Sequence, residues 1–188
     1  MSTIPPFSEE AKYSWPLNRD SLVIDVGAYE GNFSRLIAEK FDCDIWAFEP
    51  VFFKETRKNI GQRMRTTVFE AGLGSHESHE LFGVKGDSTG SWADSNNVMQ
   101  VSILPVSILY AWNHIHLLKL NCEGGEYAIL ERIIADNKVQ MFDAIMVQFH
   151  RVQPHSEERR QAIVNALSQT HNTVWSSPWV WEGFQIKR

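Results

Sequence analysis

Cysteine is scarce in this sequence. Its 188 residues include only Cys43 and Cys122, which lie far apart and lack the Cys-x-x-Cys spacing of a zinc ribbon or a thioredoxin-like redox pair. The sequence therefore gives no sign of a zinc site or a redox centre. Both thiols are predicted to be reduced residues of the core.

Positive charge is also in short supply. The chain has 18 lysines and arginines against 23 aspartates and glutamates, a formal net charge of -5, and no stripe of basic residues. Such a chain repels a polyphosphate backbone, so nucleic acid is not an expected partner. We expect a small or neutral substrate.

Long apolar runs are absent as well. No stretch approaches the roughly 18 apolar residues of a membrane span, and the first residues, MSTIPPF, show no basic region followed by an apolar run. The expected location is cytoplasmic, without a membrane partner. The sequence leaves the oligomeric state open.

Segments typical of strands and helices alternate along most of the chain. Strands are predicted over residues 21–26, 44–48, 65–69, 115–120 and 144–149, and helices over residues 32–41, 51–60, 123–136 and 157–169. This alternation predicts a doubly wound α/β fold with a mostly parallel sheet. Residues 173–176 and 180–186 predict a terminal antiparallel hairpin instead.

The remaining segments complete the expected organisation. Residues 75–84 are a candidate added strand, residues 98–106 look extended, and residues 107–112 suit a short helix. Residues 85–97 are the most loop-like segment, and Trp92 within it is a candidate for stacking on a sugar ring. We expect one domain, with an N-terminal segment (1–20), a cofactor-binding core (21–150) and a C-terminal helix and hairpin (151–188).

A turn bracketed by glycines follows the first predicted strand. In VIDVGAYEG (residues 23–31), Gly27 and Gly31 allow the backbone to approach a ligand closely. Glu49 ends the second predicted strand, where a carboxylate can accept hydrogen bonds from both hydroxyls of a ribose. The glycines alone are equally typical of an ordinary strand-to-helix turn. With Glu49 they indicate a nucleotide site.

The residues between the glycines bear on which nucleotide binds. A dinucleotide fingerprint needs Gly-x-Gly-x-x-Gly, so that a pyrophosphate can sit on the helix N-terminus. This chain has Tyr29 at the position of the second glycine, with Glu30 beside it. A bulky ring and a negative charge disfavour pyrophosphate but tolerate a sulfonium cation, so the turn favours S-adenosylmethionine over NAD.

Four blocks of the sequence occur in the order found in FkbM-type methyltransferases: VIDVGAYEG (23–31), AFEP (47–50), EAGLG (70–74) and LLKLNCEGGE (117–126). The chain resembles this family over residues 21–150. The resemblance implies a class I methyltransferase (Rossmann-like) fold, in which a seven-stranded sheet ends in an antiparallel strand. It also implies S-adenosylmethionine as cofactor and O-methylation, often of sugar or polyketide hydroxyls. The predicted cofactor-binding residues are Asp25, Gly27, Ala28, Tyr29, Gly31, Glu49, Pro50, Glu70, Ala71 and Gly72.

The predicted acceptor side consists of Asn121, Glu123 and His150. The family usually has aspartate where this chain has Asn121, beside the transferable methyl group; asparagine keeps hydrogen bonding but loses the charge and most metal affinity. His150 is a candidate general base, because it follows a predicted strand and titrates near neutral pH. Two alternatives stay open: Glu123 only supports the following helix, and His150 is a solvent-facing loop residue.

Two further features were open to more than one interpretation. Lys119 interrupts an apolar strand, so it either pairs with a carboxylate or reaches a polar edge. The group His76, Glu77, His79 and Glu80 lacks the His-Glu-x-x-His spacing, so no metal site is predicted there. For the whole chain, the alternatives to a methyltransferase are a domain that binds the cofactor without turnover and an NAD-dependent enzyme.

Overall fold

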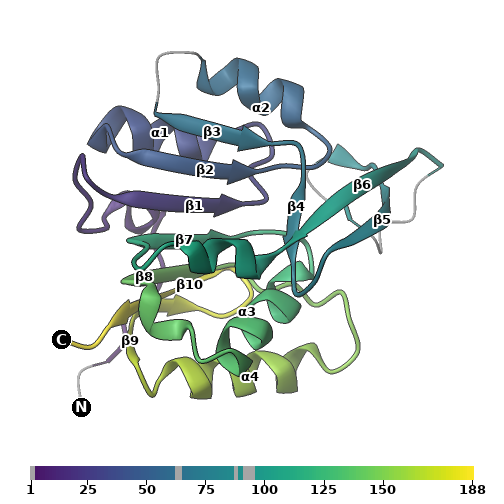
Figure 1. Ribbon diagram of the computed structural model, residues 1–188. Helices are drawn as coiled ribbons and strands as arrows, with labels where there is room; N and C mark the ends of the chain where they lie inside the picture. The colour runs from purple at the N-terminus through teal and green to yellow at the C-terminus, as the bar shows by residue number, and fades with distance from the viewer. Residues whose placement is uncertain (1–2, 62–64, 87–88, 91–95) are drawn as a thin grey trace.

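The computed structural model describes residues 3–61, 65–86, 89–90 and 96–188. The predicted alternation of strands and helices is present (Figure 1). The helices are η1 (Glu9–Tyr13), α1 (Asn32–Phe41), α2 (Phe53–Ile60), η3 (Val106–Ala111), α3 (Gly125–Ala135), η4 (Val139–Met141) and α4 (Ser156–Leu167). The strands of the large sheet are β1 (Leu22–Val26), β2 (Asp44–Phe48), β3 (Thr66–Phe69), β7 (Leu117–Leu120), β8 (Ala144–Val147), β9 (His171–Ser177) and β10 (Trp181–Ile186).

In the described part of the chain, the large sheet has seven strands in the order β3-β2-β1-β7-β8-β10-β9. Strands β3 to β8 of this order pair in parallel, whereas β10 pairs antiparallel with both β8 and β9. The order reverses between β1 and β7, which leaves a crevice outside the carboxyl ends of those strands. The predicted fold, a mostly parallel sheet that ends in an antiparallel hairpin, is confirmed.

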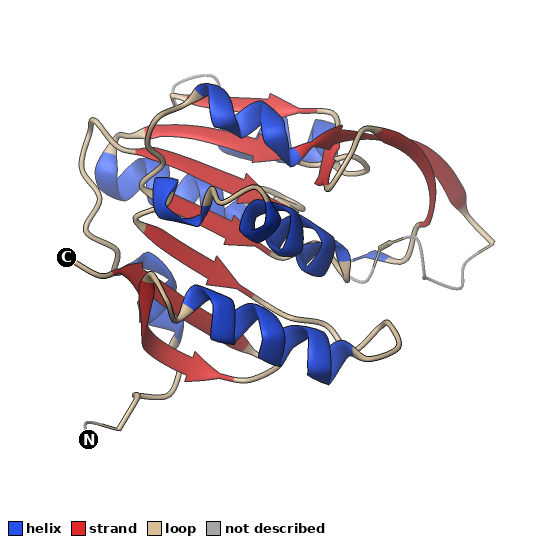
Figure 2. Ribbon diagram, turned by 60° about the horizontal axis from the view of Figure 1, so that its bottom comes forward, coloured by secondary structure: helices blue, strands red, loops and turns tan. Residues whose placement is uncertain are grey.

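Side chains of β1 alternate between the two faces of the sheet, as the pleat requires. Leu22, Ile24 and Val26 pack into one core cluster with residues of α3 and α4, whereas Val23 packs into a second cluster with residues of α1. Figure 2 shows helices on both faces of the sheet. Both faces are therefore covered, which explains why the central strands are buried along their whole length.

The N-terminal segment packs against the C-terminal hairpin. The ring of Trp15 lies 5.7 Å from that of Trp175, and the backbone N–H of Ser176 donates to the carbonyl of Pro5. Of the helices within the described ranges, none is long and apolar enough to cross a membrane.

A second sheet lies beside the carboxyl ends of the large one. It comprises β4 (Gly72–Gly74), β5 (Ser78–Gly83) and β6 (Val98–Pro105), and within the described residues these three strands have the order β4-β6-β5. Strands β5 and β6 extend as an arm away from the large sheet (Figure 1). The sequence predicted a turn at residues 70–74; instead, residues 72–74 form a strand that pairs in parallel with β6. Three residues, two of them glycine, are too few to show a strand period.

Helix boundaries differ slightly from the prediction at α3. This helix begins at Gly125 rather than Glu123, because Glu123 has φ +49° and Gly124 has φ +100°. Both residues are in left-handed conformations that a right-handed helix does not contain. They form a tight turn between β7 and α3 at the carboxyl edge of the sheet.

Candidate active site

The loops that follow β1, β2 and β7 leave the large sheet at the same edge, since these strands are parallel. Together with the second sheet they enclose a cavity of about 290 Å³. Several predicted site residues line it: Gly27, Tyr29, Glu49, Pro50, Gly72, Asn121 and Glu123. The other predicted site residues lie outside its lining: Asp25, Ala28, Gly31, Glu70, Ala71 and His150.

Asp25 is held inside the fold. Its side chain is completely buried, accepts a 2.6 Å hydrogen bond from Ser34 of α1, and forms a 2.7 Å ion pair with Lys119. The Lys119 ammonium also donates to the carbonyl of Gly27 at 2.8 Å. These contacts answer the open question about Lys119, which pairs with a carboxylate. They give Asp25 a structural role behind the turn rather than a place on the cavity wall.

Gly27 is required by a close approach of two chain segments. It has φ +75°, and a Cβ there would lie 1.8 Å from the carbonyl oxygen of Asn121. Gly31 serves helix packing instead, because a Cβ there would lie 2.9 Å from Ile60 of α2. Ala28, between them, is buried, and its backbone N–H bonds to the carbonyl of Phe48. The turn thus fastens β1 to β7 and to α2.

Glu49 is the carboxylate at the end of β2, and it is 5% exposed. Its Oε2 accepts the backbone N–H of Tyr29 at 2.7 Å, and its Oε1 accepts those of Val51 and Phe52. The pKa of Glu49 is raised, because the effect of burial is larger than that of these hydrogen bonds, which lower the pKa. The side chain is fixed in one orientation at the cavity wall, with a lone pair of Oε2 left for a ligand.

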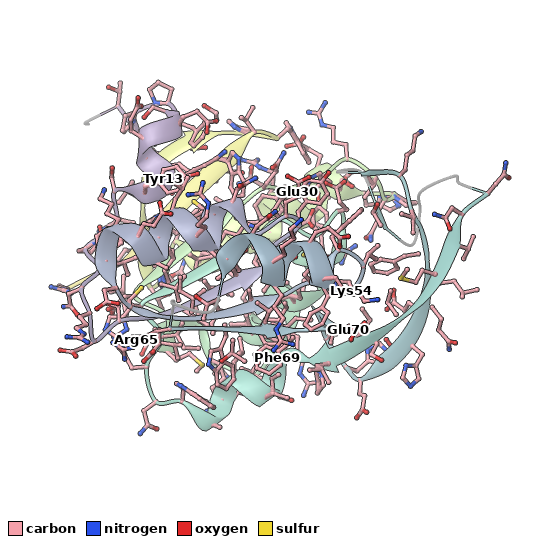
Figure 3. All side chains as sticks on the ribbon, turned by 90° about the horizontal axis from the view of Figure 1, so that it is seen from above. Tyr13, Glu30, Lys54, Arg65, Phe69 and Glu70 are labelled. Carbon is pink, nitrogen blue, oxygen red and sulfur yellow. The ribbon has the colours of Figure 1, made fainter. Side chains whose placement is uncertain are left out.

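Tyr29 stands at the cavity with φ +52°, an uncommon conformation for a large side chain. Its ring meets that of Phe52 edge-on at 4.9 Å, and Phe52 also lines the cavity. The carbonyl of Tyr29 accepts a hydrogen bond from Thr56 of α2, which secures the turn. Glu30 is exposed (Figure 3) and is not among the residues that line the cavity.

His150, Glu123 and Glu126 form a hydrogen-bonded group at the end of β8. The imidazole lies between two carboxylates, with Nε2 3.1 Å from Glu123 and Nδ1 3.2 Å from Glu126. Glu126 is completely buried and also accepts the backbone N–H groups of His150 and Gly124, both at 2.8 Å. Glu126 therefore holds His150 in place from the first turn of α3.

These contacts oppose the predicted role of His150 as a general base. Burial lowers its pKa, but the hydrogen bonds to Glu123 and Glu126 outweigh burial and raise the pKa to about 9. An imidazolium has no lone pair with which to take a proton. At neutral pH, His150 therefore acts as a cation that orients Glu123, and Glu123 is the member of the group that lines the cavity.

Asn121 follows β7 and carries an unsatisfied polar atom. Its Oδ1 is buried and has no hydrogen-bond partner among the described residues, while the residue lines the cavity. A buried acceptor without a partner is costly, so a ligand that donates a hydrogen bond there is favoured.

Of the predicted cofactor-binding residues at positions 70–72, only Gly72 lines the cavity. Glu70 follows Phe69 at the end of β3 and is exposed (Figure 3), and Ala71 is buried without reaching the cavity. Gly72 does line the cavity, and a Cβ there would lie 2.8 Å from Ile103 of β6. A larger residue at this point would therefore require the Ile103 side chain to shift.

The residues of β5 in the second sheet were missed as part of the site. Ser78, Glu80 and Phe82 line the cavity from β5, at the period of two that places alternate strand residues on one face. Residues 75–84 showed this alternation in the sequence, but nothing there indicated which face meets a ligand. Trp92, the candidate for sugar stacking, lies outside the described residues.

A group of possible metal ligands lies elsewhere in the fold. His114, His116 and Asp143 are the one such group found among the described residues, and they precede β7 and β8 rather than following them. His116 Nδ1 accepts the backbone N–H of Leu22 at 3.1 Å, which leaves the proton on Nε2. Burial and the neighbouring His114 lower the pKa of His116. His114 and Asp143 form a 2.9 Å ion pair, which accounts for the group without a metal.

Comparison with known proteins gives one family and several similar folds. The family model described as "Methyltransferase FkbM domain" matches residues 25–173. No curated protein matches the chain.

Among solved structures, the FkbM methyltransferase of Methylobacillus flagellatus KT is similar with a TM-score of 0.56 at 15% identity, over 92% of this chain and 45% of that one. This chain thus spans less than half the length of that protein. A protein of Clostridium thermocellum, described provisionally as an rRNA methylase, has a TM-score of 0.60 at 8% identity, over 100% of this chain and 99% of that one. A precorrin-6y C5,15-methyltransferase of Geobacter metallireducens GS-15 has a TM-score of 0.51 at 13% identity, over 95% of this chain and 85% of that one. At these identities the structures show the shared fold alone.

Proposed function

Because the chain belongs to the FkbM family of S-adenosylmethionine-dependent methyltransferases, we propose that it transfers a methyl group from that cofactor to a hydroxyl of a small molecule or glycan. The observation that carries the proposal is the cavity at the carboxyl edge of the sheet, where Glu49 from the end of β2 converges with Asn121 and Glu123 from the end of β7. In a doubly wound fold this crevice is where ligands bind.

The residues present fit the cofactor. Glu49 offers a fixed, buried carboxylate for ribose hydroxyls, and the unpartnered Oδ1 of Asn121 offers an acceptor for an ammonium or hydroxyl group. The acidic lining also suits a ligand that carries a sulfonium and an ammonium. The aromatic pair of Tyr29 and Phe52 supplies apolar surface at the same wall.

S-adenosylmethionine supplies a methyl group activated by a positively charged sulfur. The chain's contribution is to align an acceptor oxygen with that methyl group and to receive the hydroxyl proton. Asn121 would orient the acceptor through its side-chain amide. Glu123 would receive the proton, since it is the carboxylate at the acceptor side and His150 fixes its position.

One observation favours a second candidate, a domain that binds the cofactor without turnover. Asn121 stands where the family usually has aspartate, and an amide cannot take a proton as a carboxylate can. If Asn121 had replaced the only proton acceptor, binding would persist while transfer would be lost. The presence of Glu123 at the same wall supports the active form.

An assay of methyl transfer separates the two candidates. Protein would be incubated with radiolabelled S-adenosylmethionine and a panel of neutral glycans and small polyols, and both labelled acceptor and S-adenosylhomocysteine would be measured. The proposal predicts transfer with at least one acceptor and its loss in Glu123→Gln. Tight S-adenosylhomocysteine binding in calorimetry without transfer to any acceptor would favour the binding domain.

A further inference from the structure

The cavity has two chemically different walls. One consists of the loops after β1, β2 and β7, which include the predicted cofactor residues. The other is formed by the second sheet, in which β5 presents Ser78, Glu80 and Phe82. Glu49 and the turn after β1 account for the cofactor, so β5, together with Asn121 and Glu123, is the part of the cavity left for the acceptor.

The two faces of β5 differ in their exposure to solvent. Its intervening residues His79 and Leu81 are exposed, and Leu81 is 65% exposed, whereas Ser78, Glu80 and Phe82 are partly buried at the cavity. Cross-strand pairing with β6 fixes this register, with Glu80 opposite Val101 and Phe82 opposite Met99. A shift of one residue would turn Glu80 away from the cavity, so the pairing determines which chemistry the acceptor meets.

Glu80 is held in place at this wall. Its Oε1 accepts the hydroxyl of Ser78 at 3.1 Å. A carboxylate of this kind accepts hydrogen bonds from hydroxyls, and the neighbouring ring of Phe82 offers an apolar surface for the C–H face of an acceptor.

The charge of the cavity excludes another class of acceptor. Three carboxylates line it, those of Glu49, Glu80 and Glu123, and the described lining residues include no lysine or arginine. The histidine among the described lining residues, His76, is exposed, so a phosphate group would meet like charge with no lysine or arginine to pair with.

We propose that the β5 wall is the acceptor subsite and that Glu80 makes it selective for uncharged, hydroxyl-bearing acceptors over phosphorylated ones. The inference rests on the proposed function, since it assigns Glu49 and the turn after β1 to the cofactor. It separates this site from those of enzymes that modify nucleotides, sugar phosphates or nucleic acid. Glu80 is a specificity-determining residue here and takes no part in the transfer itself.

The test compares wild type with Glu80→Gln and Glu80→Lys, and uses Glu77→Lys as the matched control, because Glu77 is exposed and does not line the cavity. Methyl transfer would be measured with a set of neutral sugars and with their monophosphates. We expect wild type to prefer the neutral member of a pair by at least about 100-fold in kcat/KM. Glu80→Lys should reduce that preference at least about tenfold, whereas Glu77→Lys should leave it unchanged. A wild type that uses the monophosphates as well as the neutral sugars would overturn the inference.

A second measurement does not depend on finding the acceptor. With S-adenosylhomocysteine at saturation, inorganic pyrophosphate would be titrated into each variant by calorimetry. We expect no binding to wild type or Glu77→Lys and measurable binding to Glu80→Lys. If wild type and Glu80→Lys both bind pyrophosphate, or if neither does, then Glu80 does not determine whether an anion binds in this cavity. Absence of S-adenosylhomocysteine binding would instead contradict the proposed function, so the two failures are distinguishable.

Discussion

Replacing Lys119 by methionine should destabilise the protein strongly and loosen the turn after β1. The Lys119 side chain is 5% exposed and that of Asp25 0%, with 2.7 Å between their charged atoms. Removing one partner of a buried ion pair leaves the other charge uncompensated, which costs about 3–5 kcal/mol. In a chain of this size, 1 kcal/mol corresponds to about 2–4 °C in Tm, so Lys119→Met should lower Tm by about 6–20 °C.

Thermal and urea unfolding followed by circular dichroism would measure this effect. Lys58→Met is the matched control, because Lys58 is exposed on α2 and should change the free energy of unfolding by less than about 0.5 kcal/mol. The double variant Asp25→Asn/Lys119→Met removes both charges and should recover part of the loss, with a coupling of about 1–3 kcal/mol. A loss in Lys119→Met no larger than in Lys58→Met, or a coupling of zero, would refute the reasoning.

Two further predictions concern His150 and Gly27. The pKa of His150 is raised from 6.5 to about 9, so protonation stabilises the fold by about 3 kcal/mol below pH 6.5, and this stabilisation is lost as pH rises through about 9. Between pH 6 and pH 10 the free energy of unfolding should therefore fall more in wild type than in His150→Gln. The exposed His155→Gln variant should behave like wild type, and parallel pH curves for all three proteins would contradict the assignment. Gly27→Ala should cost more than about 3 kcal/mol or prevent folding, because its Cβ would clash with the Asn121 carbonyl. Gly61→Ala has nearly the same φ but open space around the Cβ, so it should cost only the backbone strain of its φ 74° and ψ 172°, about 1–3 kcal/mol, and equal losses would show that the clash is relieved.

The order of the helices and strands could be predicted from the sequence because the spacing of apolar residues within each central segment indicates whether it is a helix or a strand. The helix over residues 32–41 has the predicted bounds, and β2 matches residues 44–48. Strand β4 could not be predicted, since Gly72–Gly74 gains its extended pairing only from contact with β6, about thirty residues further along the chain.

The candidate site could be predicted from the sequence where a short motif by itself indicates the chemical role of its residues. Gly27 and Glu49 stand at strand ends that the apolar runs already define. The roles of Asp25 and His150 depend on partners distant in sequence, Lys119 and Glu126, so a pattern read along the chain could not separate a cavity residue from an internal ion pair. Glu80 was assigned to an exposed hairpin because the sequence gives alternation on β5 without showing which face meets the cavity.

The central claim is that Glu49 helps to hold S-adenosylmethionine in the cavity at the carboxyl edge of the sheet. Calorimetry with S-adenosylhomocysteine on wild type, Glu49→Ala and the exposed control Glu55→Ala tests it most directly, with NAD titrated in parallel. Loss of hydrogen bonds to a charged group predicts at least about tenfold weaker binding in Glu49→Ala, unchanged binding in Glu55→Ala and no binding of NAD. Equal affinity of wild type and Glu49→Ala, or binding of NAD in preference to S-adenosylhomocysteine, would contradict it.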